Sequence, residues 1–338
     1  MIHFFVNADS GIGLGHYRRC LNIAIELQKK GFKITFVSVS IDKELINELS
    51  IQKINHSSID SIDHLTEFLT KNASTFLIID SDDIKLYEIN FQQSLVNASI
   101  KYMIITINDQ FKYLANILFN PSILALKQQY DVAEKTIKLL GPEYFIFSKI
   151  FRGKAPEPIR QGKRVFVGFG AADPMNYTQK IVQWLLNEPF LENFEFECVL
   201  GGLNPNVESI EKLIPKTIKN IQLYHNISDI ETVYEKCDIA ICSPGTMFWE
   251  LSLFGIKSIL ISSSKREVES ANLLNDLNYA SLAQHFDNDW TKKTTDKICN
   301  DLIDQQAWAI KFEELQKKIN PNGLVKLCDQ ITNMILND

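Results

Sequence analysis

The sequence predicts an α/β protein built as two domains, each with a parallel sheet that helices cover on both faces. Short apolar runs alternate with amphipathic stretches along the chain, and strands this apolar, each followed by a helix, are typical of buried parallel sheets. A polar segment interrupts the alternation at residues 151–164. The length of 338 residues suits two domains of about 150–170 residues each.

The first half, residues 1–150, is expected to form an N-terminal Rossmann-like domain. Its predicted strands are residues 2–6, 33–38, 75–80, 101–107 and 117–120, and its predicted helices are residues 43–49, 62–71, 84–96 and one that begins near residue 15. The alternation of the two kinds of element is the signal of a parallel sheet.

The second half, residues 165–338, is expected to form a C-terminal Rossmann-like domain that binds a nucleotide. The predicted linker at 151–164 is rich in proline, glycine and basic residues. Beyond it, the predicted strands are residues 165–170, 194–200, 221–224, 238–242 and 258–262, and the predicted helices are residues 176–186, 228–236, 247–254 and two that begin near 268 and 294. The last helix is a candidate to pack back on the N-terminal domain.

Composition excludes several classes of protein. The net charge of −6 gives no support to a nucleic-acid partner. The six cysteines form no CxxC pair and show no metal-ligand spacing, which indicates free thiols in a reducing compartment. No apolar run is long enough to span a membrane. No basic region precedes the first predicted strand, so we expect no signal peptide. We therefore expect a cytoplasmic protein with no metal and no cofactor; its oligomeric state is not predicted.

A glycine turn follows the first predicted strand and carries the first candidate site. Gly11, Gly13 and Gly15 permit positive φ and let the backbone approach a ligand closely. His16 would then lie at a helix N-terminus, where an imidazole can take a proton from water or from a sugar hydroxyl. We predict His16 as the catalytic residue, with Gly13, Gly15 and Arg18 contacting the substrate. The alternative is a purely structural turn, which is common before helices in α/β proteins.

Two further polar clusters follow strands of the N-terminal half. Asp80, Asp82 and Asp83 come directly after a buried strand, and Asn108 and Asp109 end the next one. Asp80, Asp82, Asn108 and Asp109 are predicted to bind substrate hydroxyls. The alternatives are that one of the three aspartates caps the helix that starts at residue 84, or that the acids bind a metal.

The C-terminal half offers two loops suited to phosphate. The stretch 168–174 places Gly170, Ala171 and Asp173 at a strand end, where backbone N–H groups can hold a diphosphate. Asp173 could instead only cap the following helix.

The second loop follows a later strand of the same half. Ser243, Gly245 and Thr246 open another helix, and Glu250 lies one turn further on, where a carboxylate could accept two hydrogen bonds from a ribose. The alternative for Glu250 is a surface glutamate favoured by the helix dipole.

Two α/β domains of similar size, with glycine turns at strand ends, match the GT-B layout of nucleotide-sugar enzymes, in which the ligand occupies a central cleft. The motifs resemble those of PseG, the UDP-sugar hydrolase of pseudaminic acid biosynthesis, within the wider MurG-like group. The resemblance is collinear over about residues 1–285 and is carried by residues 8–20, 108–109, 119–121, 141–152, 168–176 and 243–250.

The resemblance implies a fold, a substrate class and roles for residues. It implies that His16 positions or deprotonates water, that Glu250 holds the ribose, and that the sugar is an acetamido-deoxy sugar linked to UDP. The chain departs from the family pattern at Asp80–Asp83, which lacks an aromatic residue, at Ser148, where arginine is usual, and at Ser264–Glu269, which replaces an Asn-Gln pair. Three functions follow: a UDP-sugar hydrolase of surface-glycan biosynthesis, a GT-B glycosyltransferase with the same donor, or a non-catalytic nucleotide-sugar binding module.

Overall fold

The computed structural model describes residues 1–8 and 15–336. The chain divides into two compact units: unit 1 comprises Met1–Arg152 and Asn320–Asp338, and unit 2 comprises Gly153–Ile319. The predicted linker starts at the junction of the units. Within the described residues, no helix combines the length and the apolar character needed to cross a lipid bilayer.

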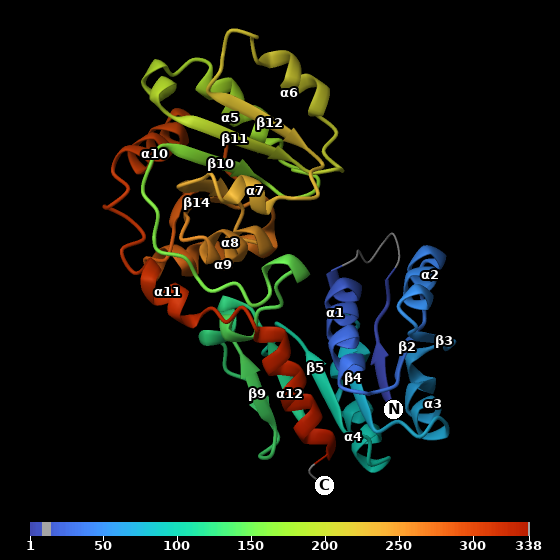
Figure 1. Ribbon diagram of the computed structural model, residues 1–338. Helices are drawn as coiled ribbons and strands as arrows, with labels where there is room; N and C mark the ends of the chain where they lie inside the picture. The colour runs from blue at the N-terminus through green and yellow to red at the C-terminus, as the bar shows by residue number, and fades with distance from the viewer. Residues whose placement is uncertain (9–14, 337–338) are drawn as a thin grey trace. The chain divides into compact units, whose positions relative to one another are not determined.

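Unit 1 is built on a parallel sheet with the strand order β3-β2-β1-β4-β5-β7-β9 (Figure 1). Its strands are β1 (Ile2–Phe5), β2 (Ile34–Ser38), β3 (Asn55–Ser58), β4 (Phe76–Asp80), β5 (Tyr102–Ile105), β7 (Ile117–Asn120) and β9 (Ile137–Leu140). Its helices are α1 (Gly15–Lys29), α2 (Lys43–Ile51), α3 (Leu65–Lys71), α4 (Ile89–Asn97) and α12 (Gly323–Leu336). All five predicted strands are confirmed, and the chain winds outward from β1 in both directions, as in a doubly wound fold.

The sequence does not predict β3 or β9, because both lie at edges of the sheet and bury few side chains. None of the four residues of β3 is buried, and in β9 only Leu139 is buried. The short pair β6 (Lys112–Tyr113) and β8 (Asp131–Val132) forms a separate two-stranded sheet. Without an apolar run, such strands leave no periodic signal in the sequence.

Helices cover both faces of the unit 1 sheet, because successive strand residues point to opposite sides. Phe4 and Ile78 pack in one core cluster with α1, α2 and α12. Phe5 and Ile79, the next residues along the same strands, pack in a second cluster with α3 and α4. Burial of these strands on both faces explains why they read as continuous apolar runs.

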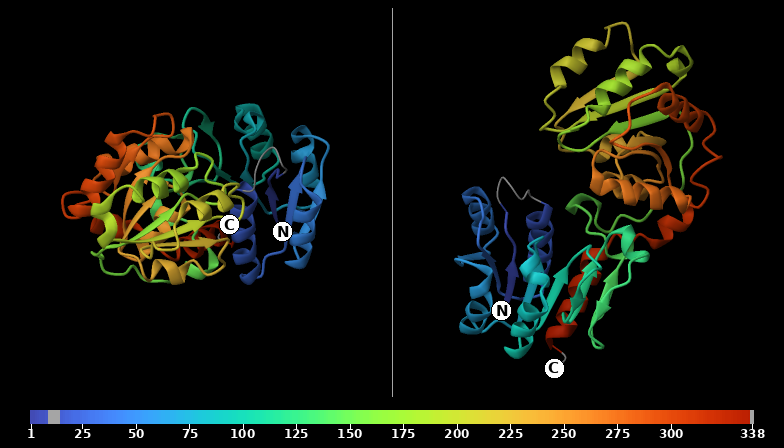
Figure 2. Two further views of the ribbon diagram at one scale, coloured as in Figure 1. Left: turned by 90° about the horizontal axis from the view of Figure 1, so that it is seen from above. Right: turned by 180° about the vertical axis from the view of Figure 1, so that it is seen from behind.

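The last helix, α12, belongs to unit 1 although more than 160 residues of unit 2 precede it in the chain. It lies beside the sheet of unit 1 (Figure 1, Figure 2). Leu327 and Ile331 are fully buried there, and Lys30 pairs with Asp329 at 2.5 Å. A Cβ at Gly323 would lie 2.6 Å from the carbonyl oxygen of Phe145, so this close backbone approach requires glycine.

Unit 2 contains a second parallel sheet with the order β12-β11-β10-β13-β14-β15. Its strands are β10 (Arg164–Gly168), β11 (Glu195–Leu200), β12 (Ile221–His225), β13 (Ile239–Cys242), β14 (Lys257–Ile261) and β15 (Ser281–Gln284). Its helices are α5 (Tyr177–Leu185), α6 (Val207–Leu213), α7 (Glu231–Tyr234), α8 (Thr246–Leu253), α9 (Lys265–Asp276), α10 (Lys292–Ile303) and α11 (Phe312–Lys318). The five predicted strands are confirmed, and β15, a half-buried edge strand, is the one that the sequence does not predict.

The polar loops of each unit gather at the carboxyl edge of its own sheet. In unit 1, Phe5 of β1 pairs with Ile79 of β4, and Asp80 of β4 pairs with Ile105 of β5. In unit 2, Cys242 of β13 pairs with Gly168 of β10. Because all these strands are parallel, the loops after them emerge side by side, beside the point where the chain reverses its winding direction.

Candidate functional site

His16 lies in the first turn of α1, the helix that follows β1. Gly15 begins this helix and is exposed, and an added Cβ there would meet no atom of the described residues within 4 Å. Gly11 of the predicted turn and Gly13, a predicted substrate contact, lie outside the described residues.

A buried carboxylate, Asp80, is the centre of the polar cluster in unit 1. It ends β4 and is fully buried. The Nδ1–H of His16 donates to Asp80 Oδ1 at 2.6 Å. Arg19 donates from Nε to Oδ2 and from Nη2 to Oδ1, both at 2.7 Å. The Cys20 thiol, 3.7 Å from Oδ2, adds a weak fourth contact.

These contacts keep Asp80 charged and favour the charged form of His16. Burial alone would raise the pKa of Asp80, but the Arg19 guanidinium and the hydrogen bonds from His16 and Arg19 outweigh it and hold that pKa below its ordinary value. The hydrogen bond to Asp80 raises the pKa of His16, against the opposing effect of partial burial. The cluster therefore holds an ionised carboxylate behind the imidazole.

This geometry corrects the prediction that Asp80 binds substrate hydroxyls. Both of its oxygens are occupied by His16 and Arg19, and its side chain has no exposed surface. Its carboxylate instead orients the imidazole through Nδ1. Nε2, the other ring nitrogen of His16, lies 3.4 Å from Oδ2 of Asp82, beyond the usual length of such a hydrogen bond. The Asp82 side chain is 68% exposed and accessible to a ligand.

Arg19 is the residue of this cluster that sequence reasoning missed, in favour of its neighbour Arg18. The structure does not bring Arg18 to the cluster: its guanidinium is half exposed and pairs with Glu48 of α2. Arg19 stands three residues after His16, so both side chains project from one face of α1. This three-residue spacing is the feature of the sequence from which Arg19 could have been predicted as a partner in the cluster.

The remaining acidic and amide residues at this edge of the sheet do not belong to the cluster around Asp80. Asp83 accepts a hydrogen bond from the backbone N–H of Lys85 at 3.0 Å, which is the capping role considered as an alternative. Asn108 Oδ1 accepts from the backbone N–H of Gln110 at 2.9 Å and shapes the loop after β5. Asp109 is half-buried in the same loop. Among the described residues, no group of acids, histidines or cysteines is arranged to hold a metal ion.

The loop after β10 carries backbone conformations that are uncommon for side-chain-bearing residues. Asp173 and Asn176 have φ of +44° and +52°, and Gly170 has φ of +76°. Both Asp173 oxygens accept backbone hydrogen bonds, from Tyr177 at 2.9 Å and from Thr178 at 2.8 Å. Asp173 is 2% exposed, so its side chain has the capping role considered as the alternative, and the contact of its backbone with the nucleotide stays a prediction.

Gly170 and Ala171, in the same loop, are exposed and available to a ligand. A Cβ on Gly201 would lie 2.4 Å from Ala171 Cα, so the loop after β11 presses directly against this backbone. The oxygen atoms Asn176 Oδ1 and Thr178 Oγ1 are buried at the start of α5 and have no hydrogen-bond partner among the described residues. Such a fixed, strained loop is of the kind that protein backbones use at ligand sites.

The loop after β13 leads into α8 and presents a free helix N-terminus. Gly245 precedes the helix and Thr246, its first residue, is exposed. A Cβ at Gly245 would meet only Glu267 Oε1 and Ser243 Oγ, each at 3.9 Å. The first N–H groups of a helix lack partners within it and attract anions. This end of α8 can therefore hold phosphate oxygens.

Glu250 lies one turn into α8 and is 8% exposed. Tyr234 donates its phenolic O–H to Glu250 Oε2 at 3.3 Å. Burial, together with the charge of Glu250, raises the pKa of the Tyr234 phenol well above its ordinary value. Glu250 is thus held by a neighbouring element, unlike the exposed surface glutamate considered as its alternative.

Comparisons with known proteins find relatives of low sequence identity. No family model matches the chain. Over 271 residues, 76% of its length, the chain is 25% identical to an uncharacterized protein of Methanocaldococcus jannaschii, of which it spans about half (54%). It is 18% identical over 284 residues to the spore coat polysaccharide biosynthesis protein SpsG of Bacillus subtilis, with 81% of each chain covered.

Several solved structures align with nearly the whole of this chain. MurG of Acinetobacter baumannii superposes with a TM-score of 0.71 at 13% identity, over 98% of this chain and 99% of that one. The spinosyn rhamnosyltransferase SpnG gives 0.60 at 11%, over 97% and 100%, and a UGT transferase of Siraitia grosvenorii, solved with UDP, gives 0.62 at 9%, over 98% and 99%. At such identities the likeness establishes the fold alone: this chain has the GT-B fold of two Rossmann-like domains, as predicted.

Proposed function

We propose that this protein is a nucleotide-sugar enzyme of surface-polysaccharide biosynthesis, in which His16 is the general base. The observation that carries this is the 2.6 Å hydrogen bond from His16 Nδ1 to the buried, ionised Asp80. It fixes the tautomer of the neutral imidazole, so that the lone pair lies on Nε2. A base held in this way typically accelerates a reaction by about 10²–10⁴-fold.

The preferred reaction is hydrolysis of a UDP-linked acetamido-deoxy sugar, by the resemblance to PseG. Water attacks the anomeric carbon and gives a proton to His16 Nε2, the bond from that carbon to the diphosphate oxygen breaks, and UDP leaves. The backbone N–H groups beside Gly170, Gly245 and Thr246 stabilise the departing diphosphate. Glu250 accepts hydrogen bonds from the ribose.

A second candidate is transfer of the sugar to an acceptor hydroxyl, with His16 deprotonating that hydroxyl in place of water. The likeness to the rhamnosyltransferase SpnG favours it, and SpsG, a spore coat polysaccharide biosynthesis protein, is compatible with either reaction. The missing aromatic residue at Asp80–Asp83 also alters the sugar side relative to the PseG pattern.

One experiment separates these functions. The purified protein is incubated with a panel of UDP-linked acetamido sugars, with and without glycan acceptors, while UDP and free sugar are measured. Release of sugar and UDP in equal amounts without an acceptor supports hydrolysis, and UDP release that depends on an acceptor supports transfer. Tight UDP binding with no turnover on any sugar would contradict both and leave a binding module.

A further inference from the structure

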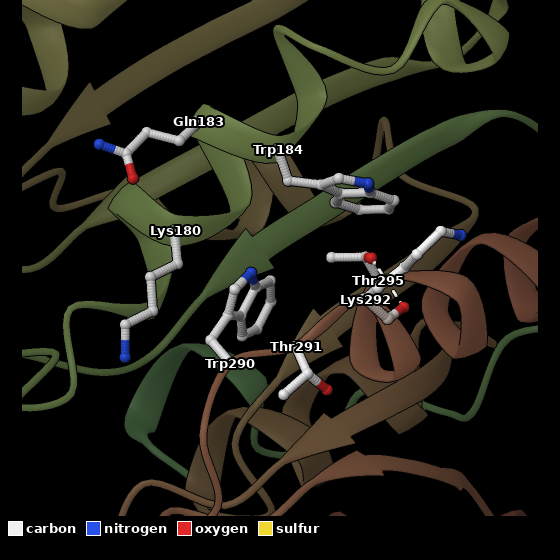
Figure 3. A pocket seen from close by; sticks show the side chains of 7 residues that line it. All are labelled: Lys180, Gln183, Trp184, Trp290, Thr291, Lys292 and Thr295. Carbon is white, nitrogen blue, oxygen red and sulfur yellow. Dashed lines mark hydrogen bonds between the residues drawn. The ribbon is translucent and has the colours of Figure 1, made fainter.

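A hollow of about 300 Å³ lies in unit 2 between α5 and the start of α10. Figure 3 shows its lining side chains: Lys180, Gln183, Trp184, Trp290, Thr291, Lys292 and Thr295. None of them belongs to the loops at the carboxyl edge that were assigned to the nucleotide. Its volume is at the lower end of the range of about 300–1,000 Å³ that is usual for small-molecule sites.

The hollow presents two accessible indole rings. Trp184 and Trp290 are half-buried, whereas the other two tryptophans, Trp249 and Trp308, are only 6% and 7% exposed. In Figure 3 the two indoles come from different elements, Trp184 from α5 and Trp290 from the segment before α10. A half-buried indole leaves a large apolar surface in contact with water. Two such rings around one hollow indicate a ligand with apolar ring faces.

The anchoring of these side chains makes the hollow a defined shape. Trp290 leans on the Tyr177 ring, with centroids 6.1 Å apart and planes tilted by 41°. The Lys180 ammonium lies over the same Tyr177 ring at 5.0 Å from its centroid. Lys180, Gln183 and Trp184 follow the i, i+3, i+4 spacing of one helix face. These contacts hold Trp290 and Lys180 against the Tyr177 ring, whereas in Figure 3 the Gln183 amide points away from the two indole rings.

Two lysines and no acidic residue line the hollow, although the net charge of the chain is −6. Asp296 and, more weakly, Glu188 lie near Lys292 and raise its pKa. Lys292 pairs with Asp296, one turn further along α10, at 2.7 Å. Lys180 makes no ion pair with any of the residues that the structure describes. Its ammonium is available to an anion carried by the ligand.

We propose that this hollow binds an acidic saccharide. The indole faces would stack on the C–H faces of sugar rings, Thr291 and Thr295 would exchange hydrogen bonds with ring hydroxyls, and Lys180 would pair with the carboxylate. A nucleic acid is disfavoured because the overall negative charge repels a phosphate backbone. The site is independent of the proposed enzymatic reaction and lies outside its residues.

Tryptophan fluorescence tests this proposal directly, because the two accessible indoles both line the hollow. Acrylamide quenching of the intact protein is measured while trigalacturonate is titrated, with maltotriose as a neutral control that has equal ring number and linkage. We expect saturable protection by trigalacturonate and at least about threefold weaker protection by maltotriose, since one exposed ion pair contributes only a few-fold. No protection, or equal protection by both trisaccharides, would overturn the proposal.

Two substitutions test where trigalacturonate binds, and competition with UDP tests whether this site is separate from the nucleotide site. Trp290→Ala should weaken trigalacturonate binding by roughly two- to tenfold, and Lys180→Ala should remove the preference over maltotriose. Lys293→Ala is the matched control, because this exposed neighbour does not line the hollow. Circular dichroism checks the fold of each variant. Undiminished affinity in Trp290→Ala, or displacement of trigalacturonate by UDP, contradicts a separate saccharide site here.

Discussion

The carboxyl edge of the unit 1 sheet is lined by ionisable side chains, whereas that of the unit 2 sheet is lined mainly by backbone. In unit 1, His16 and Arg19 converge on Asp80 within 2.7 Å. In unit 2, the loops after β10 and β13 offer Gly170, Gly245 and a helix N-terminus. The first six strands of the two sheets follow the same order, yet the groups at their carboxyl edges differ in kind.

Under the proposed function, this difference separates catalysis in unit 1 from ligand holding in unit 2. A proton acceptor must be tuned by neighbouring charges, which requires side chains fixed by mutual hydrogen bonds. A diphosphate needs only many donors at close range, which a glycine loop and a helix N-terminus supply without any charge of their own. Asp173 shows the same division, since its carboxylate fixes a backbone loop, whereas Asp80 fixes an imidazole.

The largest expected effect is the loss of turnover when the base is removed from unit 1. His16→Ala should lower kcat by about 10²–10⁴-fold. Arg18→Ala is the matched control, because Arg18 pairs with Glu48 on α2, and it should retain most of the activity. Activity assays with both variants make the test, and normal turnover in His16→Ala would remove the imidazole from the mechanism.

The second prediction concerns the charge behind the imidazole. Asp80→Asn keeps the shape but leaves Arg19 without its counter-charge, so the free energy of unfolding should fall by about 3–5 kcal/mol. The pKa of Asp80 is lower in the folded protein than its ordinary value of 3.8. The ionised carboxylate therefore stabilises the folded protein fully above pH 3.8. This stabilisation is lost as the pH falls through the pKa that Asp80 has in the folded protein. Urea denaturation from neutral to acid pH measures this.

The control for Asp80→Asn is the substitution Asp83→Asn, which keeps an oxygen that can cap the same backbone N–H. Asp83→Asn should change the unfolding free energy by no more than about 0.5 kcal/mol. If Asp80→Asn proved equally harmless, the buried carboxylate would not be the centre of this cluster.

The third prediction probes the backbone site of unit 2. At Gly245 an added Cβ meets only ordinary contacts at 3.9 Å, so Gly245→Ala should fold normally. It should nevertheless weaken UDP binding by roughly tenfold or more, because the added methyl group would keep the diphosphate away from the backbone N–H groups. Each hydrogen bond lost from a charged group costs about 1.5–3 kcal/mol. Isothermal titration with UDP measures it. Gly15→Ala in unit 1 has equally open space and should leave UDP affinity unchanged.

The smallest expected effect is a shift of the pH profile of activity. His16 acts as a base only when neutral, and its pKa is raised above 6.5, so activity should rise with pH through a value above 6.5. Asp82 contributes to that raised pKa from its place 3.4 Å from Nε2. Asp82→Asn should therefore move the rising limb to lower pH by less than about one unit. A limb that moves to higher pH would contradict the assigned charge of Asp82.

The sequence alone was sufficient to predict the strands that are buried on both faces. Runs such as Phe76–Asp80 can only be stabilised between two layers of helices, and the parallel GT-B fold follows from their alternation with helices. The place of His16 at the start of a helix was also predictable from the sequence, because the residues that begin a helix are a local signal. The edge strands β3, β9 and β15 were not, since they lack buried runs.

The roles of the charged residues were decided only by tertiary structure. Asp80 and Arg19 are 61 positions apart in the chain. The sequence around neither residue indicates that their side chains form a hydrogen bond. Sequence reasoning chose Arg18 over Arg19 and assigned Asp80 to the substrate. The physical reason is that a charge can be buried only where partners from other elements surround it, and those partners are set by strand order and helix packing. The return of α12 to unit 1 depends in the same way on the buried face that unit 1 provides.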